Sequence, residues 1–239
     1  MNKFDNFLNK AGNVKIGKNN RLDKVNRVLV IGDLHEPFSL DKYLDHCYSV
    51  YKKYRCNVVV FTGDIIDNHY SSYHETDPDG YSAGEELNRA IDRLSKWYAK
   101  FPNAIVLIGN HDRIVCRKAF TGGVSKTWIR DYKDVLNTPR WNFVEDIVID
   151  NTLYCHGEGK KARTRAKDEL TSVVQGHYHS DSYVEYFVGS NYKIFAMQSP
   201  CGVDKESYAM VYGKHFKKPA IGCSVVIDGK KAYLEMMEL

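Results

Sequence analysis

Gly109-Asn110-His111-Asp112 closes the apolar run Ala104-Ile105-Val106-Leu107-Ile108, so polar side chains follow a stretch that reads as a buried strand. A strand end fixes the direction of a side chain, and the loop beyond it leaves that side chain free to reach a ligand. The same layout occurs twice upstream. Residues 28–31 run into Gly32-Asp33-Leu34-His35, and residues 58–61 run into Thr62-Gly63-Asp64-Ile65-Ile66-Asp67. The sequence therefore predicts strand ends that carry ligand-forming residues.

The composition is that of an ordinary soluble globular protein. Of 239 residues, 43% are hydrophobic and 27% are charged, enough to bury a core as one domain. The formal net charge of +4 is compatible with an anionic substrate but carries almost no weight alone. The six cysteines show no C-x-x-C spacing, and neither a secretory signal nor a membrane-spanning run is present. We expect reduced thiols, a cytoplasmic location and no membrane partner.

The first half of the domain alternates strands with helices. Amphipathic helices are predicted from Ser39 to about Tyr54 and from about Glu85 to Lys100, between the three strands. This order indicates a parallel sheet with crossover helices. Residues 68–84 are predicted to form a long loop, a kind that is usually functional or disordered. Residues 1–24 are expected to be a polar N-terminal extension, either a short docking helix or a frayed tail, before a single domain over residues 25–239.

The second half has a different pattern, with more strands that follow one another directly. Helical pieces are expected over residues 113–136, interrupted by Gly122-Gly123, and a helix over residues 159–170. The predicted strands are residues 143–149, 153–155, 172–175, 183–188, 193–198, 221–227 and 231–236. The last two turn at Asp228-Gly229, a strong hairpin signal. We expect two sheets, the first more parallel and the second more antiparallel, with helices outside.

Residue types that bind metals recur at the strand ends. In chain order they are Asp33-x-His35, Asp64, Asn110-His111, His156 and His177-x-His179. The D-x-H spacing puts two ligands on one side of an extended segment, and a carboxylate has two oxygens with which to bridge two cations. A lone histidine is more often an ordinary imidazole, but five of the nine histidines fall in this series. Nitrogen and oxygen ligands without thiolate suit manganese, iron, zinc or cobalt rather than a structural cysteine–zinc site.

These blocks resemble the signature of the calcineurin-like metallophosphoesterase superfamily, which reads D-x-H, G-D-x-x-D, G-N-H-[DE], H and G-H-x-H. All five occur in order between residues 32 and 179. The resemblance implies an α/β fold, a four-layer α/β/β/α sandwich of two mixed sheets flanked by helices, and a phosphoester hydrolase with two metal ions. The stretch from Ser199 to Lys218 is also similar to phosphoesterases encoded by phages and their bacterial hosts.

Carried over block by block, the resemblance assigns the metal ligands. One metal ion is held by Asp33, His35 and His179, and the other by Asn110, His156 and His177, with Asp64 bridging both. His111 lies beside the leaving group and is not a ligand. Asp112 is expected to orient the His111 imidazole, and Asp67 lies outside the ligand set. Glu36-Pro37 stands where the family often has glycine, which we expect to change the rim beside the first metal.

The resemblance also implies the chemistry. Two divalent cations about 3.5–4 Å apart clamp the phosphoryl oxygens and activate a bridging hydroxide, while His111 donates a proton to the leaving oxygen. Manganese is favoured, with iron, zinc, cobalt, nickel and magnesium as alternatives.

Three weaker features bear on the substrate, and each has a structural alternative. In loop 68–81, tyrosines (Tyr70, Tyr73, Tyr81) can stack a base and histidines (His69, His74) can meet a phosphate, or the loop is an ordinary surface loop. The basic run Lys160, Lys161, Arg163, Arg165 and Lys167 contacts a nucleic-acid backbone, or forms a solvated helix face. Arg113 binds a phosphate oxygen, pairs with Asp112 or begins the next helix.

The leading hypothesis is a phosphodiesterase whose substrate is a nucleotide or nucleic acid. The alternative is a phosphomonoesterase acting on phosphoproteins or small molecules. A third reading is a scaffold that kept the fold and lost the activity, but such proteins usually lack some ligands, and none is missing here.

Overall fold

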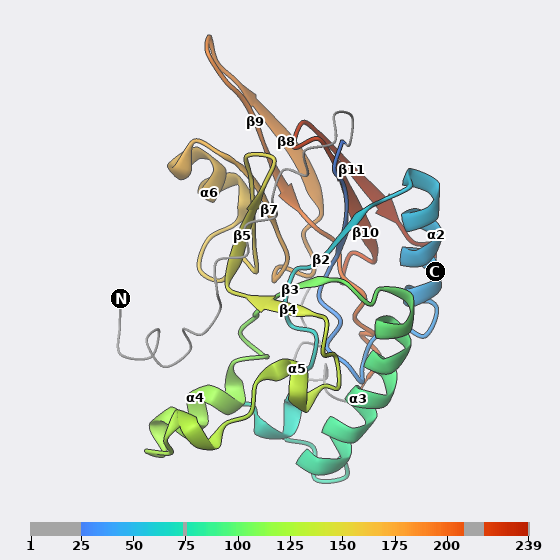
Figure 1. Ribbon diagram of the computed structural model, residues 1–239, viewed down its shortest axis with the longest axis vertical. Coiled ribbons are helices and arrows are strands. Elements are labelled where there is room, and N and C mark those ends of the chain that lie inside the picture. The colour runs from blue at the N-terminus through green and yellow to red at the C-terminus, as the bar shows by residue number, and fades with distance from the viewer. Residues whose placement is uncertain (1–24, 74–75, 208–217, 239) are drawn as a thin grey trace.

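Two β-sheets lie face to face at the centre of the computed structural model (Figure 1). The structure describes residues 25–73, 76–207 and 218–238. The predicted N-terminal extension and most of the stretch from Lys205 to Lys218 lie outside the described residues. Among the described helices, none is both long and apolar enough to cross a membrane. All six cysteines are free thiols.

The first sheet has the strand order β11-β10-β1-β2-β3-β4. Its strands are β1 (Arg27–Ile31), β2 (Val58–Phe61), β3 (Ile105–Leu107), β4 (Asn142–Val144), β10 (Gly222–Ile227) and β11 (Lys231–Met236). The second sheet has the order β5-β6-β7-β9-β8. Its strands are β5 (Asp146–Ile149), β6 (Thr152–Cys155), β7 (Ser172–Gln175), β8 (Tyr183–Val188) and β9 (Lys193–Gln198).

Helices cover the outer faces of both sheets. On the first sheet they are α2 (Tyr43–Tyr54) and α3 (Ala83–Lys100), and on the second sheet α6 (Ala162–Glu169). The other helical segments are α4 (Ile114–Thr121), α5 (Tyr132–Val135) and the 3₁₀ turns η1 (His69–Ser71) and η2 (Lys126–Trp128). Helix α2 begins later than predicted, since Ser39 forms an antiparallel bridge with Val203 instead. The predicted loop 68–84 contains η1 and the start of α3.

Three apolar clusters hold four layers together. Leu94 and Trp97 of α3 and Cys47 of α2 pack on the first sheet, and apolar side chains of the two sheets, Val60 and Val174 among them, fill the space between them. On the far side, α6 packs on the second sheet through its small alanines. Figure 1 shows the same order, with α2 and α3 on one side and α6 on the other. The predicted α/β/β/α sandwich is confirmed.

Two details of the predicted topology were wrong. Residues 143–149 are two strands rather than one: β4 pairs with β3 in the first sheet, and β5 pairs with β6 in the second. The C-terminal hairpin, which turns at Asp228-Gly229 as predicted, joins the first sheet antiparallel to β1. Both sheets are therefore mixed. Alternation of apolar and polar residues identifies a strand but says nothing about its pairing partner, which is why the sequence misplaced both.

The parallel strands bring their carboxyl ends to a common edge. β1, β2, β3 and β4 are parallel neighbours in the first sheet, and β6, β7 and β9 are parallel neighbours in the second. Ligands of open α/β sheets bind outside the carboxyl ends of the strands, so this edge is where the polar blocks are expected to meet.

Candidate metal centre

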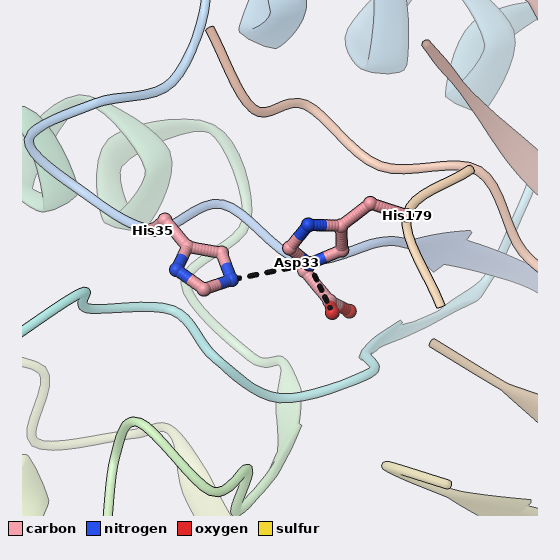
Figure 2. Close-up of side chains that lie close together, drawn as sticks. All are labelled: Asp33, His35 and His179. Carbon is pink, nitrogen blue, oxygen red and sulfur yellow. Dashed lines mark hydrogen bonds and ion pairs between the residues drawn. The ribbon is translucent and has the colours of Figure 1, made fainter. Parts of the chain in front are cut away.

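The polar strand ends of both sheets meet at this edge, and they form two clusters of nitrogen and oxygen atoms. Asp33, His35 and His179 form the first cluster, and their ligand atoms lie within 4.8 Å of one another. The Nε2 atoms of His35 and His179 are 3.2 Å apart, and His179 Nε2 is 3.1 Å from Asp33 Oδ2. Figure 2 shows that Asp33 and His35 come from one segment of the chain and that His179 approaches them from another.

The second cluster contains Asp64, His156 and His177, again within 4.8 Å. His156 Nε2 lies 3.2 Å from Asp64 Oδ2 and 3.1 Å from His177 Nδ1. The amide oxygen of Asn110 is 2.8 Å from the same His156 nitrogen. The four residues predicted around the second metal thus lie together.

Asp64 lies between the two clusters. Its Oδ2 faces His156 in the second cluster and is 3.7 Å from His35 Nε2 in the first. Its Oδ1 accepts a hydrogen bond of 2.7 Å from the backbone amide of His111. One oxygen is therefore fixed by the backbone and the other is directed toward both clusters, the arrangement that a bridging carboxylate needs.

Hydrogen bonds outside the clusters set the tautomers of two imidazoles. His35 Nδ1 is 2.5 Å from Asp67 Oδ1, and His156 Nδ1 donates to the carbonyl oxygen of Thr62 at 2.9 Å. Because these oxygens only accept, each Nδ1 carries a proton, so Nε2 is the nitrogen that loses its proton to bind a metal ion. Thr62 also donates through its hydroxyl to Asp33. The sequence reasoning missed the role of Thr62, although it directly precedes the Gly63-Asp64 block.

Two glycines of the signature are required by close approach rather than by a tight turn. A Cβ on Gly109 would lie 2.1 Å from Asp64 Oδ1, and one on Gly176 would lie 2.1 Å from Asp33 Oδ1. Any other residue at either position would displace a carboxylate from the site. The ligands themselves occupy left-handed backbone at Asp64 and His177, with φ of 46° and 71°, a strained state that clusters at functional sites.

Asp112 does not orient His111, so that prediction was wrong. His111 Nδ1 lies 2.7 Å from the backbone carbonyl oxygen of Asp67 and 3.4 Å from its carboxylate. Asp112 instead accepts from backbone amides, at 2.8 Å from Gly109 and at 3.1 and 3.3 Å from Ile65 and Ile66. Asp67 therefore faces His35 and His111, while Asp112 fastens the loops that carry Asp64 and Asn110.

The electrostatics of the two clusters favour the charged forms of Asp33 and Asp64. Burial alone would raise the pKa of Asp64, but His156 and His111 hold it well below its usual value. In return, the charge of Asp64 outweighs burial at His156 and raises the pKa of that imidazole to about 10. Burial likewise lowers the pKa of His111, yet Asp64 and Asp67 leave it above the ordinary value. The anionic charge of this site attracts a positive partner.

The residues fit divalent metal ions. The two clusters offer buried carboxylate oxygens, imidazole nitrogens and one amide oxygen, without a thiol. Such a set suits a borderline transition metal. A third group, made of His35, Asp67 and His111, presents the two Nδ1 atoms that hold protons, so it serves the imidazoles rather than a cation.

The predicted substrate residues differ in their surroundings. Tyr70 and Tyr73 are 52% and 63% exposed near the site, and His74 lies outside the described residues. Tyr81 instead packs under the guanidinium of Arg89 at 4.3 Å. Arg113 precedes α4 as one alternative expected, but it pairs with Glu145 and Glu158 rather than with Asp112. A phosphate would compete with both carboxylates there.

The basic run on α6 is largely paired with acidic side chains, as a solvated helix face would be. The pairs are Lys160–Asp168, Lys161–Asp181, Arg163–Glu185 and Arg165–Glu169. Lys167 lies over the ring of Phe187 at 4.9 Å.

Glu36 does not form the rim of the site, and that prediction was also wrong. Its side chain is buried beneath α3, where it pairs with Arg93 and accepts from the indole nitrogen of Trp97 at 2.9 Å. Two further residues that support the site were missed. Asn68 donates to the carbonyl oxygen of His111 at 2.9 Å, and Glu86 accepts from the first amides of η1. Neither lies in a strand-end block.

Comparison with known proteins gives a family match over most of the chain. The family model described as calcineurin-like phosphoesterase matches residues 26–200. No curated protein matches significantly.

Solved structures resemble the chain only distantly. Vacuolar Protein Sorting 29 from Cryptosporidium parvum is 14% identical with a TM-score of 0.44, covering 91% of this chain and 99% of its own. The nuclease MPE of Pseudomonas putida is 12% identical with a TM-score of 0.43, covering 87% and 86%. The phosphoesterase Yfce from E. coli is 12% identical with a TM-score of 0.41, covering 83% and 87%.

Proposed function

This chain belongs to the calcineurin-like phosphoesterase family, and from that premise we propose that it hydrolyses phosphodiester bonds in nucleotides or nucleic acid with two divalent cations. The observation that carries the proposal is the position of Asp64, whose Oδ2 faces His156 of one cluster and His35 of the other. Manganese is the proposed metal, on the grounds of the mixed nitrogen and oxygen donors.

Each cluster has the residues for one cation. Asp33, His35 and His179 would hold the first, and Asn110, His156 and His177 the second, with Asp64 between them. When bound, a pair of divalent cations neutralises phosphoryl oxygens and lowers the pKa of a shared water toward neutrality. The hydrogen bonds of His35 to Asp67 and of His156 to Thr62 orient both imidazoles before substrate arrives.

His111 is the proposed proton donor to the leaving oxygen. Its Nδ1 is held by the Asp67 carbonyl, so Nε2 is the nitrogen left for the substrate. The pKa of His111, raised against burial by Asp64 and Asp67, favours the protonated form that an acid needs. The His111 side chain is 16% exposed, against 2% for the side chain of Asp67, so it can contact a substrate.

A diester rather than a monoester is proposed because two exposed tyrosines follow the residue that bonds to His111. Asn68, bonded to the His111 carbonyl, leads directly into η1, which contains the exposed Tyr70, and the exposed Tyr73 follows two residues after η1. Base-sized aromatic surface beside a phosphoester site suits nucleotides, because every base has a face that can stack.

Hydrolysis of two small esters tests the proposal. With Mn²⁺ bound, we expect the protein to hydrolyse bis-p-nitrophenyl phosphate, and to lose this activity in Asp64→Ala together with the metal. Activity confined to p-nitrophenyl phosphate would overturn the diesterase assignment in favour of a monoesterase. If elemental analysis shows two bound metal ions and neither ester is hydrolysed, the proposal that the protein is a hydrolase is overturned.

A further inference from the structure

Two glutamines end neighbouring strands of the second sheet, and both are completely buried. Gln175 is the last residue of β7 and Gln198 the last of β9, and the two lie directly opposite each other on these parallel strands. Alternate residues of a strand share one face, so both side chains lie on the face of Val173 and Ala196, which pack under α6. A pair of amides therefore ends an otherwise apolar face.

The two amides are bonded to each other and to the backbone. Gln175 Nε2 donates to Gln198 Oε1 at 3.2 Å and to the carbonyl oxygen of Lys160 at 2.8 Å. Gln198 Nε2 donates to the carbonyl oxygen of Gly176 and, at 3.3 Å, to that of Gln175. Because a carbonyl oxygen only accepts, these contacts determine which end of each amide is the nitrogen.

These carbonyl groups belong to the loops that carry the histidines of the second sheet. One loop runs from His156 to α6, and the other begins at Gly176, directly before His177. The amide of Gly176 donates to the carbonyl oxygen of His156 at 3.0 Å, so the two loops are also joined directly. A Cβ on Gly157 would lie 2.5 Å from Gln175 Nε2, so this amide packs against the backbone next to His156. The glutamine pair therefore fastens both loops to the end of the second sheet.

An apolar pair at these positions would cost the fold less. Gln175 Oε1 is buried, and no donor among the residues that the structure describes bonds to it. A buried acceptor without a partner destabilises the folded state, whereas two apolar side chains of the same shape can replace a buried polar pair at almost no loss. Positions that break such a rule are expected where function requires it. The amides therefore need a reason other than stability, and the loops that they bind supply one.

We infer that Gln175 and Gln198 are positioning residues for the metal centre. Their amides fix the backbone of the loops after β6 and β7, and so direct the imidazoles of His156, His177 and His179 toward the cations. They act through the backbone rather than as ligands. This inference rests on the proposed function, since it names residues that prepare the same site.

The double variant Gln175→Met with Gln198→Met tests the inference. Methionine is close to glutamine in length and volume but has no amide, so both members of the pair are removed and neither is left unpaired. The backbone carbonyl oxygens of residues 175 and 176 also accept from the backbone amides of Ser199 and Tyr178, and these bonds remain.

Metal affinity and stability should respond differently in this variant. Isothermal titration calorimetry should show that the affinity for Mn²⁺ falls by roughly 10- to 100-fold, the range for lost groups that orient metal ligands. Urea unfolding of the metal-free protein should show a midpoint close to that of the wild type. A purely structural role predicts the reverse, a lower urea midpoint with unchanged Mn²⁺ affinity in the folded protein.

Tyr183→Phe is the matched control. Tyr183 lies directly opposite Gln198 on the neighbouring strand β8, and its hydroxyl accepts from the backbone amide of Arg163 at 3.1 Å. The substitution removes a hydrogen bond between a side chain and the backbone from the same row of residues, but that bond holds α6 rather than a loop with a ligand. The affinity of Tyr183→Phe for Mn²⁺ should equal that of the wild type.

A second variant keeps the test decisive if the double variant does not fold. Gln175→Met alone removes the unpartnered acceptor and keeps the bond that Gln198 donates to Gly176, and it should still bind Mn²⁺ more weakly than Tyr183→Phe. Wild-type affinity in the folded glutamine variants, or an equal fall in Tyr183→Phe, would overturn the inference.

The proposed function fails separately, because none of these measurements uses hydrolysis. Wild-type protein that binds Mn²⁺ but hydrolyses neither ester, with weaker binding in the glutamine variants, overturns only the hydrolase. Wild-type protein that hydrolyses bis-p-nitrophenyl phosphate, with unchanged Mn²⁺ affinity in the glutamine variants, overturns only the inference.

Discussion

The Nδ1 atom of His111 lies 2.7 Å from the backbone carbonyl oxygen of Asp67. A carbonyl oxygen only accepts hydrogen bonds, so Nδ1 donates and Nε2 is the nitrogen available to a substrate. The carboxylate of the same Asp67 is bonded to His35, so one residue serves both a proposed proton donor and a proposed metal ligand. Substitutions at His111, Asp67 and Asp112 should therefore separate catalysis, metal affinity and stability.

His111→Ala should keep both metals and lose turnover in proportion to the need for protonation. On a dinucleotide, whose leaving group is poor, we expect a loss of about 10²- to 10⁴-fold in kcat. On bis-p-nitrophenyl phosphate the loss should be much smaller, because p-nitrophenolate leaves without a proton. Steady-state kinetics on both substrates, with metal content measured in parallel, checks this. Equal losses of turnover on both substrates would exclude His111 as the proton donor.

Asp67→Asn should weaken metal binding through His35. The carboxylate that fixes the Nδ1 proton would be replaced by a neutral amide, and loss of such a partner typically costs 10- to 100-fold in metal affinity. Isothermal titration calorimetry with Mn²⁺ measures the change in metal affinity. Asp92→Asn, an exposed acid on α3, is the control and should bind metal like the wild type. An unchanged affinity for Mn²⁺ in Asp67→Asn would contradict the proposal that Asp67 supports metal binding through His35.

Asp112→Asn should act mainly on stability. Its carboxylate accepts three backbone amides, and an asparagine side chain would turn an N–H donor toward at least one of them. A buried donor left unpaired costs about 1–3 kcal/mol. Urea unfolding should show this loss, with metal affinity in the folded protein changed less than in Asp67→Asn. The opposite ranking would restore Asp112 as a partner of the metal ligands.

The carboxyl group of Glu86 should make stability depend on pH. Burial raises its pKa above the ordinary value, with Asp67 adding to the shift, despite hydrogen bonds from the η1 amides. The folded state then binds more protons than the unfolded state between the two pKa values, so the contribution of Glu86 falls as pH rises through that window. The unfolding free energy of the wild type minus that of Glu86→Gln should be larger at pH 4 than at pH 7. A difference that grew with pH would contradict the sign.

Arg93→Ala should be strongly destabilising, because it strands the buried carboxylate of Glu36. Arg93 also donates to Asp41 and to the carbonyl oxygen of Ser39, both at 2.7 Å. Breaking a buried pair by removing one partner costs about 3–5 kcal/mol. Lys230→Ala removes an exposed pair with Asp228, which solvent screens, so it should change the stability little. Urea unfolding measures the loss of stability in both variants. Similar small losses would show that the buried Glu36 carboxylate does not need Arg93.

The four layers and the gathering of the proposed ligands could be predicted because the pattern of each is local in the sequence. Asp33-x-His35 and His177-x-His179 are short spacings at strand ends, and buried strands read as apolar runs. The partners of Asp112, Glu36 and Arg113 could not be predicted, because they depend on which loops fold against one another. Asp112 bonds to amides across two strand ends, and Glu36 meets Arg93 from a helix more than fifty residues away. The charge of a residue, read from the sequence, does not identify the residue with which it pairs.

The division of residues 143–149 between β4 and β5 was missed for a related reason. Val144 and Ile147 are both buried, so the apolar pattern continues while the hydrogen-bonding partner changes from one sheet to the other. Pairing is set by long-range geometry that a single sequence does not display.

Each of the two clusters draws residues from both sheets. Asp33, His35, Asp64 and Asn110 follow strands of the first sheet, whereas His156, His177 and His179 follow strands of the second. A cation that needs both sets favours the state in which the sheets are docked, by RT ln(1 + [L]/Kd). Because such linkage is reciprocal, a side chain between the sheets and away from the site, such as the buried Tyr154, also contributes to metal affinity. The centre and the interface between the sheets therefore form one thermodynamic unit, and the affinity for metal reports on the integrity of the core.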